Sequence, residues 1–213
     1  MKFKWLYKNN NSKIILFFNG WGMDDGVVKH LNPEDYDVLM FYDYSTLDTD
    51  FNFESLNIYL EKNLIAWSMG VMIGSCLASS LALSHREGKK VAINGTLKPI
   101  DAKFGIHPKI YDLTIKGFDE KGREKFISSM FDKKFEINCQ REISEQLSEL
   151  IALKNYQADE SFKYNKILIS DNDKIIPTKS QVAFWGKEPN LKGGHCPFFN
   201  FTKWSELLWL IKI

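Results

Sequence analysis

The segment with the clearest chemical pattern is Leu64–Gly74, where an apolar run ends at a serine and a small-residue segment follows. Ser68 has Ala66 two positions before it and Gly70 two positions after it. A sharp turn from a strand into a helix needs small residues at both positions, because it holds the serine in a strained backbone conformation. The turn also sets the serine at a helix N-terminus, where free amides stabilise negative charge. The pattern indicates a nucleophilic serine, although a serine that opens a helix is also a common N-cap.

A serine hydroxyl becomes a good nucleophile when a base accepts its proton and an acid orients that base. In the chain order that accompanies this kind of turn, the acid follows the serine and the histidine comes last. Two aspartates, Asp171 and Asp173, follow the apolar run 166–170. We favour Asp173, because the apolar segment Ile175–Pro177 directly behind it can bury its carboxylate. An Asx turn or a helix cap is the structural alternative for either aspartate.

The base is expected to be His195, which lies in a loop with two glycines before it and Pro197 after it. Of the four histidines, it alone follows Asp173 in the chain. His107, in a Gly-Ile-His-Pro segment, is the main competitor, but it precedes the aspartate and breaks the expected order. The sequence therefore predicts a triad of Ser68, Asp173 and His195.

Two backbone amides must hold the negative oxygen that develops when the serine attacks an ester. Met69, directly after the serine, supplies one amide. We assign the other to Trp21, in the loop Asn19–Gly22 that follows the apolar run 13–18. Asn-Gly is also a common hairpin turn, but no clear strand begins directly after Met23. These elements occur in one consistent chain order, and together they predict a serine hydrolase.

The elements that must position these residues alternate along the chain. Strand-like apolar runs are separated by helix-length segments, which predicts an α/β fold with a mostly parallel sheet and helices on both faces. The segments after Ser68, to Ala82, and from Trp204 to Ile213 are helical in character. The strand-like runs are 3–7, 13–18, 36–42, 63–67, 89–94 and 166–170.

Between Thr96 and Asn165 the pattern changes, because the stretch contains no convincing buried strand. Its charged amphipathic segments are 120–132 and 140–155. In the second segment, apolar residues recur at helical spacing at Ile143, Leu147, Leu150 and Ile151. We predict a single domain over residues 1–213, with a helical cap inserted at about 97–164.

The composition of the chain limits the classes of partner that the protein is expected to bind. The chain has 213 residues, 44% of them hydrophobic, and its 28 Lys and Arg against 27 Asp and Glu leave a net charge of +1. This balance gives no reason to expect nucleic acid. The chain shows neither a secretory signal nor an apolar stretch long enough for a membrane span, so we expect a cytoplasmic protein. Cys76, Cys139 and Cys196 form no disulfide framework and no metal-ligand spacing, and no cofactor is expected.

Four segments of the chain together resemble the BioG-type pimeloyl-[acyl-carrier protein] methyl ester esterases, compact α/β-hydrolases of biotin biosynthesis. BioH-type esterases, which catalyse the same reaction, have a similar Gly-Trp-Gly loop, Trp-Ser-x-Gly turn and His-x-Pro-Phe segment. The resemblance spans nearly the whole chain, although Ala66 departs from the glycine more common in the wider superfamily. The four segments are FFNGWGMD at 17–24, AWSMG at 66–70, AINGT at 92–96 and GHCPF at 194–198.

The resemblance implies hydrolysis of the methyl ester at the far end of a pimeloyl chain carried on acyl-carrier protein, with release of methanol. It implies Ser68 as nucleophile, Asp173 as acid and His195 as base. Trp21 and Met69 are the implied oxyanion donors. We also expect the side chains of Trp21 and Trp67 to contact the substrate. The partner is then an acyl-carrier protein, and we expect a monomer.

Three alternatives stay open. The same triad serves an acyl thioesterase or a general short-chain carboxylesterase, since fold and triad do not fix the leaving group. The third alternative is a binding module that has kept the fold but not the catalytic activity.

The Lys and Arg residues of the predicted insertion are mixed with acids, so they form either a docking patch for an acidic carrier or a solvated surface of mixed charge.

Overall fold

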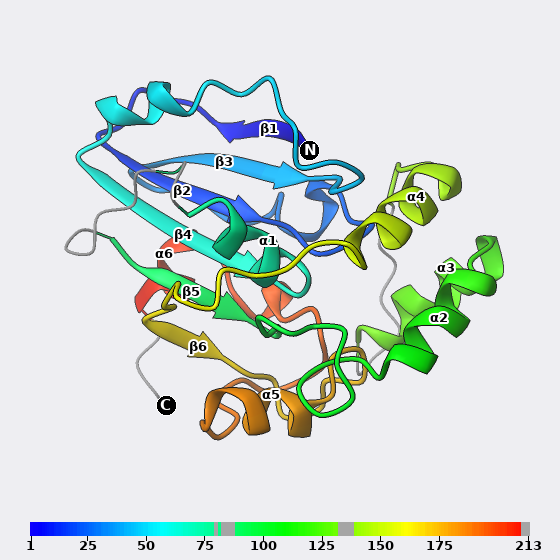
Figure 1. Ribbon diagram of the computed structural model, residues 1–213. Coiled ribbons are helices and arrows are strands. Elements are labelled where there is room, and N and C mark those ends of the chain that lie inside the picture. Colours follow the sequence, from blue (N-terminus) through cyan, green and yellow to red (C-terminus); the bar gives the residue numbers. More distant parts are fainter. Residues whose placement is uncertain (79–80, 82–87, 132–138, 210–213) are drawn as a thin grey trace.

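The computed structural model describes residues 1–78, 81, 88–131 and 139–209. These residues form one six-stranded sheet with the strand order β1-β3-β2-β4-β5-β6 (Figure 1). Strands β2 to β6 pair in parallel, and β1 runs antiparallel to β3 at the edge. The strands are β1 (Lys2–Tyr7), β2 (Lys13–Phe18), β3 (Tyr36–Tyr42), β4 (Glu61–Trp67), β5 (Lys90–Ile93) and β6 (Lys166–Leu168).

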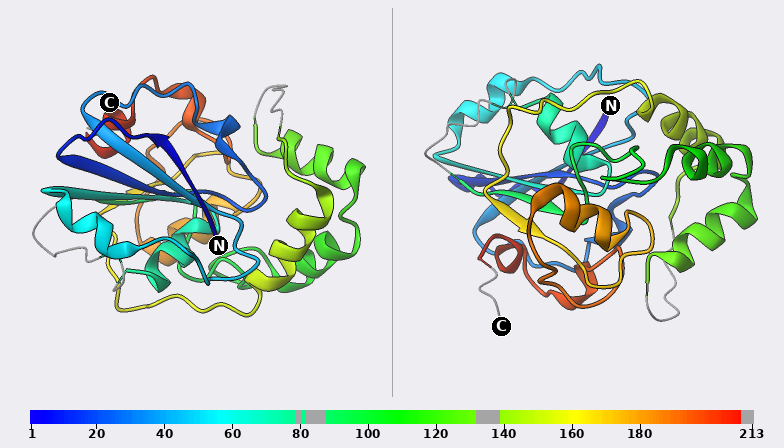
Figure 2. Two further views of the ribbon diagram at one scale, coloured as in Figure 1. Left: turned by 90° about the horizontal axis from the view of Figure 1, so that it is seen from above. Right: turned by 60° about the horizontal axis from the view of Figure 1, so that its bottom comes forward.

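Helices cover both faces of the sheet, with α1 on one face and α6 on the other (Figure 2). Successive strand residues alternate between two buried cores, so Leu16 and Phe18 pack on one side and Ile15 and Phe17 on the other. The described α-helices are α1 (Gly70–Cys76), α2 (Pro108–Lys116), α3 (Glu120–Ser129), α4 (Ile143–Leu153), α5 (Thr178–Trp185) and α6 (Trp204–Trp209). Short 3₁₀ helices lie at Asp25–Val27, Phe53–Ile58 and Phe198–Asn200.

The predicted fold class is confirmed, and each predicted strand is present with ends shifted by up to two residues. The first two strands follow one another in the chain but are not neighbours, because β1 pairs with β3. Helix α1 begins at Gly70 and ends at Cys76, so it is shorter than the helical segment predicted at 68–82, of which residues 79–80 and 82 lie outside the described ranges. Helix α6 begins at Trp204 as predicted, and residues 210–213 lie outside those ranges. No helix of the described residues has the length and apolar character needed to cross a bilayer.

Between β5 and β6 the chain forms α2, α3 and α4, which lie beyond the carboxyl ends of the parallel strands (Figure 1). We call these three helices the cap. Helices α3 and α4 fall inside the predicted amphipathic segments, whereas α2 was not singled out. The domain boundaries and the extent of the insertion remain predictions.

The buried face of α4 differs from the one that its apolar residues predicted. Ile151 is 49% exposed, and Ile143 and Leu147 are only partly buried. The helix is rotated so that two polar side chains share its buried face with two leucines. The four buried residues are Gln146, Glu149, Leu150 and Leu153.

Candidate active site

Ser68 occupies a strained turn between β4 and α1. Its φ angle is +58°, in the left-handed region that most residues avoid, as expected for a nucleophile held on a strand-to-helix turn. The start of α1 packs tightly on the end of β2. A Cβ atom added at Gly70 would lie only 2.3 Å from the carbonyl oxygen of Phe18, so no larger residue fits there. Ala66 is fully buried, between its register partners in β2 and β5. The small residues on either side of the serine therefore fit the crowding around this turn.

The structure brings the three predicted triad residues together. The Nε2 atom of His195 lies 2.8 Å from the hydroxyl oxygen of Ser68. The Nδ1 atom of the same ring lies 2.7 Å from Oδ2 of Asp173. All three residues are buried, and His195 is only 1% exposed. These residues form a continuous hydrogen-bonded chain from carboxylate to imidazole to hydroxyl.

The carboxylate of Asp173 is fixed by three further donors. Its Oδ1 accepts hydrogen bonds from the amides of Ile175 and Ile176 at 2.9 and 3.1 Å. Its Oδ2 accepts a hydrogen bond from the side-chain amide of Gln181 in α5 at 2.8 Å. Asp171 is not part of this arrangement, because its carboxylate binds Lys192 and the amide of Gly193. The sequence pointed to the apolar segment behind Asp173 but not to Gln181.

Two buried side chains hold the loop that carries the histidine. The indole of Trp67 donates a hydrogen bond to the carbonyl oxygen of His195 at 2.8 Å. The side-chain amide of Asn94 donates to the same oxygen at 2.9 Å and to the hydroxyl of Ser170 at 2.7 Å. Asn94 was not among the predicted site residues, although it lies in the AINGT segment. Trp67 is 1% exposed and its ring lies 5.4 Å from that of His195, so it supports the histidine. The contacts of Trp21 and Trp67 with substrate remain predictions.

The loop after β2 is ordered by its own side chains and by contacts with the cap. Asn19 accepts a hydrogen bond from the amide of Gly20 and donates one to the carbonyl oxygen of Asp24. The Trp21 ring packs against Phe118 and Phe126 at centroid distances of 4.9 and 4.7 Å.

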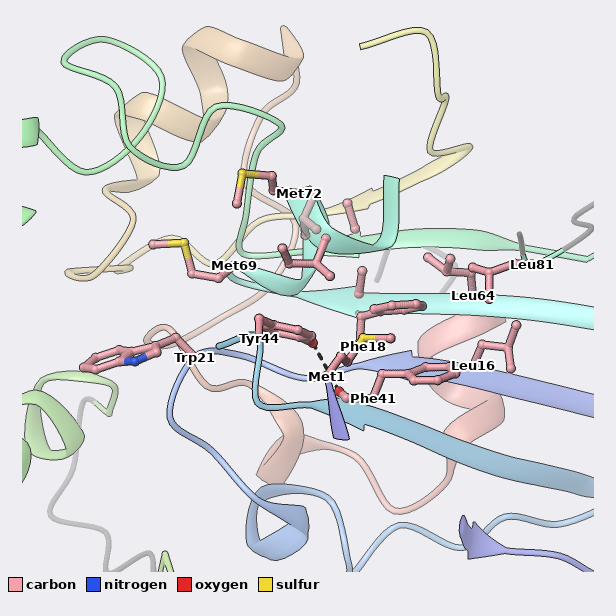
Figure 3. Close-up of a cluster of buried hydrophobic side chains, with 14 of the residues drawn as sticks. Met1, Leu16, Phe18, Trp21, Phe41, Tyr44, Leu64, Met69, Met72 and Leu81 are labelled. Atoms are coloured by element: carbon pink, nitrogen blue, oxygen red, sulfur yellow. Dashed lines mark hydrogen bonds between the residues drawn. The ribbon is translucent and has the colours of Figure 1, made fainter. Parts of the chain in front are cut away.

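Figure 3 shows Trp21 and Met69 at the same end of one apolar cluster, beyond the strand ends. Within the described part of the chain, the backbone amides of these two residues donate no hydrogen bond to the protein. Both amides are therefore available to an acceptor, as an oxyanion site requires.

His107, the competing histidine, lies away from this chain of hydrogen bonds. It is the N-cap of α2, and its Nδ1 accepts a hydrogen bond from the amide of Lys109. It therefore has a structural role at the start of a cap helix.

Comparison with known proteins identifies the family. A family model described as the pimeloyl-ACP methyl esterase BioG matches residues 1–207. The chain belongs to the BioG family. The crystal structure of selenomethionine BioG from Haemophilus influenzae is similar to this chain with a TM-score of 0.85 and 31% identity. The match covers 98% of this chain and 100% of that one.

Other relatives extend the comparison. An uncharacterized Haemophilus influenzae protein is 32% identical over 216 residues, which cover 94% of this chain and 96% of that protein. A Bacteroides fragilis protein named malonyl-[acyl-carrier protein] O-methyltransferase is 35% identical over 185 residues. These cover 83% of this chain but only 37% of that protein, so the chain spans little more than a third of its length. The α/β hydrolase MGS-M2, from a deep-sea metagenome, shares the fold at 14% identity with a TM-score of 0.57.

The thiol next to the histidine is expected to be unreactive in this BioG family member. Cys196 is buried, and burial raises the pKa of its thiol, so the thiolate that reacts with alkylating reagents is suppressed. We expect iodoacetamide to leave Cys196 unmodified in the folded protein and to modify it after denaturation, as read by mass spectrometry of the peptides. Rapid modification of Cys196 in the folded protein would contradict this expectation.

Proposed function

We propose that this chain is a serine carboxylesterase that hydrolyses the methyl ester of a pimeloyl chain carried on acyl-carrier protein. The observation that carries the proposal is the hydrogen-bonded chain of Ser68, His195 and Asp173 at the end of β4. This arrangement supports a nucleophilic serine mechanism. Membership of the BioG family supports the choice of substrate.

In the first half of the reaction, Ser68 attacks the ester carbonyl carbon while its proton passes to Nε2 of His195. The Nδ1–H of His195 donates to Asp173, which stabilises the imidazolium that forms. The amides of Trp21 and Met69 hold the negative oxygen of the tetrahedral intermediate. His195 then gives its proton to the departing methoxide, so that methanol leaves and an acyl-enzyme remains.

In the second half, water takes the place of the serine hydroxyl. His195 accepts a proton from the water as the oxygen attacks the acyl-enzyme, and the same two amides hold the second tetrahedral intermediate. The collapse of this intermediate returns the proton to Ser68 and releases the free carboxylate. Trp67 acts in this scheme by positioning the His195 loop.

The exposed surface of α2 supports an acidic protein partner. Ile110 and Leu113 are 55% and 62% exposed, and they lie three residues apart on one helix face. Lys109 and Lys116 are exposed on the same helix. Exposed aliphatic side chains among lysines suit the docking of an acidic carrier protein, because opposite charges steer the encounter.

A comparison of substrates tests this function. We expect the value of kcat/KM for methyl pimeloyl-carrier protein to exceed that for dimethyl pimelate, p-nitrophenyl butyrate and a pimeloyl thioester by at least about tenfold, a difference of 1.4 kcal/mol. Methanol release measures ester cleavage, and loss of the carrier thioester measures thioesterase activity. The same carrier bearing unmethylated pimelate is the matched control and should release no methanol.

Each alternative gives a different result in these assays. A thioesterase would release the acyl chain from the carrier faster than it releases methanol. A general carboxylesterase would prefer the free esters. A binding module without catalysis would turn over none of the substrates and would not react with a fluorophosphonate. Any of these results would overturn the proposed function.

A further inference from the structure

The buried face of α4 carries two polar side chains that both contact the loop containing Trp21. Gln146 is 1% exposed and Glu149 is 0% exposed. They are separated by one turn of the helix, so both point to the same side. A buried helix face more often carries apolar residues, because an unpaired buried polar group costs free energy. The contacts that these two side chains make therefore need an explanation.

The two side chains hold Gly22 by both of its backbone polar atoms. The amide of Gly22 donates a hydrogen bond to Oε2 of Glu149 at 3.1 Å. Its carbonyl oxygen accepts one from the side-chain amide of Gln146 at 2.7 Å. Gly22 has a φ angle of +72°, a conformation that glycine adopts without strain. Glu149 thus fixes the peptide unit that joins Trp21 to Gly22, and Gln146 fixes the next one, which joins Gly22 to Met23.

The side chain of Trp21 is held by the same helix. Its indole Nε1 donates a hydrogen bond to the backbone carbonyl oxygen of Gln146 at 2.8 Å. Trp21 is therefore restrained both through its ring and through the peptide bond that follows it. Since the proposed oxyanion donor is the backbone amide of Trp21, α4 fixes the residue that carries this donor.

The charge of Glu149 is balanced within the protein. Arg141 donates a hydrogen bond to Glu149 at 2.6 Å, and the amide of Tyr44 donates another at 3.1 Å. Arg141 also forms an ion pair with Asp43 at 3.2 Å. Burial raises the pKa of the Glu149 carboxyl, while Arg141 and the amides of Tyr44 and Gly22 oppose this shift. The carboxylate is thus surrounded by donors, one of which belongs to the loop after β2.

We infer that Gln146 and Glu149 are positioning residues for catalysis: by holding both backbone polar atoms of Gly22, they fix the loop directly after Trp21 so that the Trp21 amide faces the developing oxyanion. This inference rests on the proposed function. A preorganised donor stabilises the transition state more than the bound substrate, because negative charge appears on the oxygen only as the reaction proceeds. Loss of either contact therefore acts on kcat rather than on KM.

The test uses Gln146→Met, which keeps the length of the side chain and removes its donor, with hydrolysis of p-nitrophenyl acetate as the assay. We expect kcat to fall about 10- to 100-fold with KM changed less than about threefold. Deleting an oxyanion donor costs about 10²- to 10³-fold, and here the donor is displaced rather than deleted. Binding of an alkyl boronic acid, whose adduct with Ser68 mimics the tetrahedral intermediate, should weaken by the same factor as kcat.

Two further variants separate positioning from folding. Ser148→Ala, on the exposed side of α4, is the matched control and should leave kcat unchanged. Glu149→Gln keeps the shape of the side chain but loses the charge that pairs with Arg141, so it should lower kcat similarly and also lower the melting temperature. If this second variant fails to fold, Gln146→Met alone decides the test. The pH at which kcat reaches half of its plateau should not move in Gln146→Met, since the triad is untouched.

The outcomes of these experiments test the positioning role separately from the proposed esterase function. If Gln146→Met keeps kcat and boronate affinity within twofold of the wild-type values, while Ser68→Ala is inactive, the positioning role is wrong and the esterase mechanism stands. If KM and kcat change by equal factors, Gln146 shapes substrate binding instead and the inference is also wrong. If Ser68→Ala is as active as the wild type, the proposed function itself fails.

Discussion

Replacing Ser68 with alanine is expected to lower kcat for ester hydrolysis by about four orders of magnitude or more. The variant lacks the oxygen that attacks the ester carbonyl, and no other hydroxyl is hydrogen-bonded to His195 among the described residues. Residues of a triad act as a unit, so loss of one costs about as much as loss of several. Turnover of methyl pimeloyl-carrier protein and labelling by a fluorophosphonate both measure the effect.

A matched serine is available as a control for this variant. Ser75 is also buried in the segment that follows β4, but its hydroxyl donates to the carbonyl oxygen of Met72 rather than to a histidine. We expect Ser75→Ala to keep both labelling and turnover. The double variant Ser68→Ala with His195→Ala should be no slower than Ser68→Ala alone. Persistent labelling of the Ser68→Ala protein would show that a different residue is the nucleophile.

Replacing Asp173 with asparagine is expected to reduce kcat by about 10³- to 10⁴-fold. Asparagine keeps the size of the side chain, but it loses the charge that stabilises the imidazolium of His195 and favours the wrong tautomer of the ring. If the asparagine oxygen stays with the amides of Ile175 and Ile176, its NH2 group faces both His195 and the side-chain amide of Gln181, where the carboxylate now accepts hydrogen bonds. Steady-state kinetics over a range of pH, with the thermal midpoint as a check on folding, measure the change.

The neighbouring aspartate is the control for this second variant. Asp171 binds Lys192 at the surface, and Lys192 is 94% exposed, so this ion pair contributes little to stability. We expect Asp171→Asn to keep kcat within about twofold, since an exposed ion pair contributes little and the asparagine oxygen can still accept the hydrogen bond from the Gly193 amide. A loss of activity in Asp171→Asn equal to that in Asp173→Asn would contradict the placement of the acid.

Local sequence patterns were sufficient to find the residues that meet at the candidate site. The turn around Ser68 imposes small neighbours, and these are visible in the sequence at Ala66 and Gly70. The choice between two aspartates followed from the apolar residues behind Asp173, which provide the amides that bind its carboxylate. The order of the chain then left His195 as the base. Their catalytic roles remain predictions that the variants above test.

The supporting residues could not be predicted in the same way, because their partners are distant in the sequence. Asn94 is one such residue, since its acceptor on His195 is 101 residues away. Gln181 is only 8 residues from Asp173, but its contact depends on how α5 packs against the loop, which no local pattern reveals. The burial of Gln146 and Glu149 could not be predicted for a different reason. The apolar residues of α4 predicted its helical period correctly, but tertiary contacts with the loop after β2 decide which face is buried.

The ion pairs of Arg141 join the cap to the end of β3, where Asp43 directly follows the strand. Removal of one member of a buried ion pair leaves the other charge without compensation, which is strongly destabilising. We therefore expect substitutions at positions 43, 141 and 149 to be tolerated in combination rather than singly. Across homologous chains these three positions should covary, and a chimera that borrows the cap of another family member must borrow its residue 43 as well.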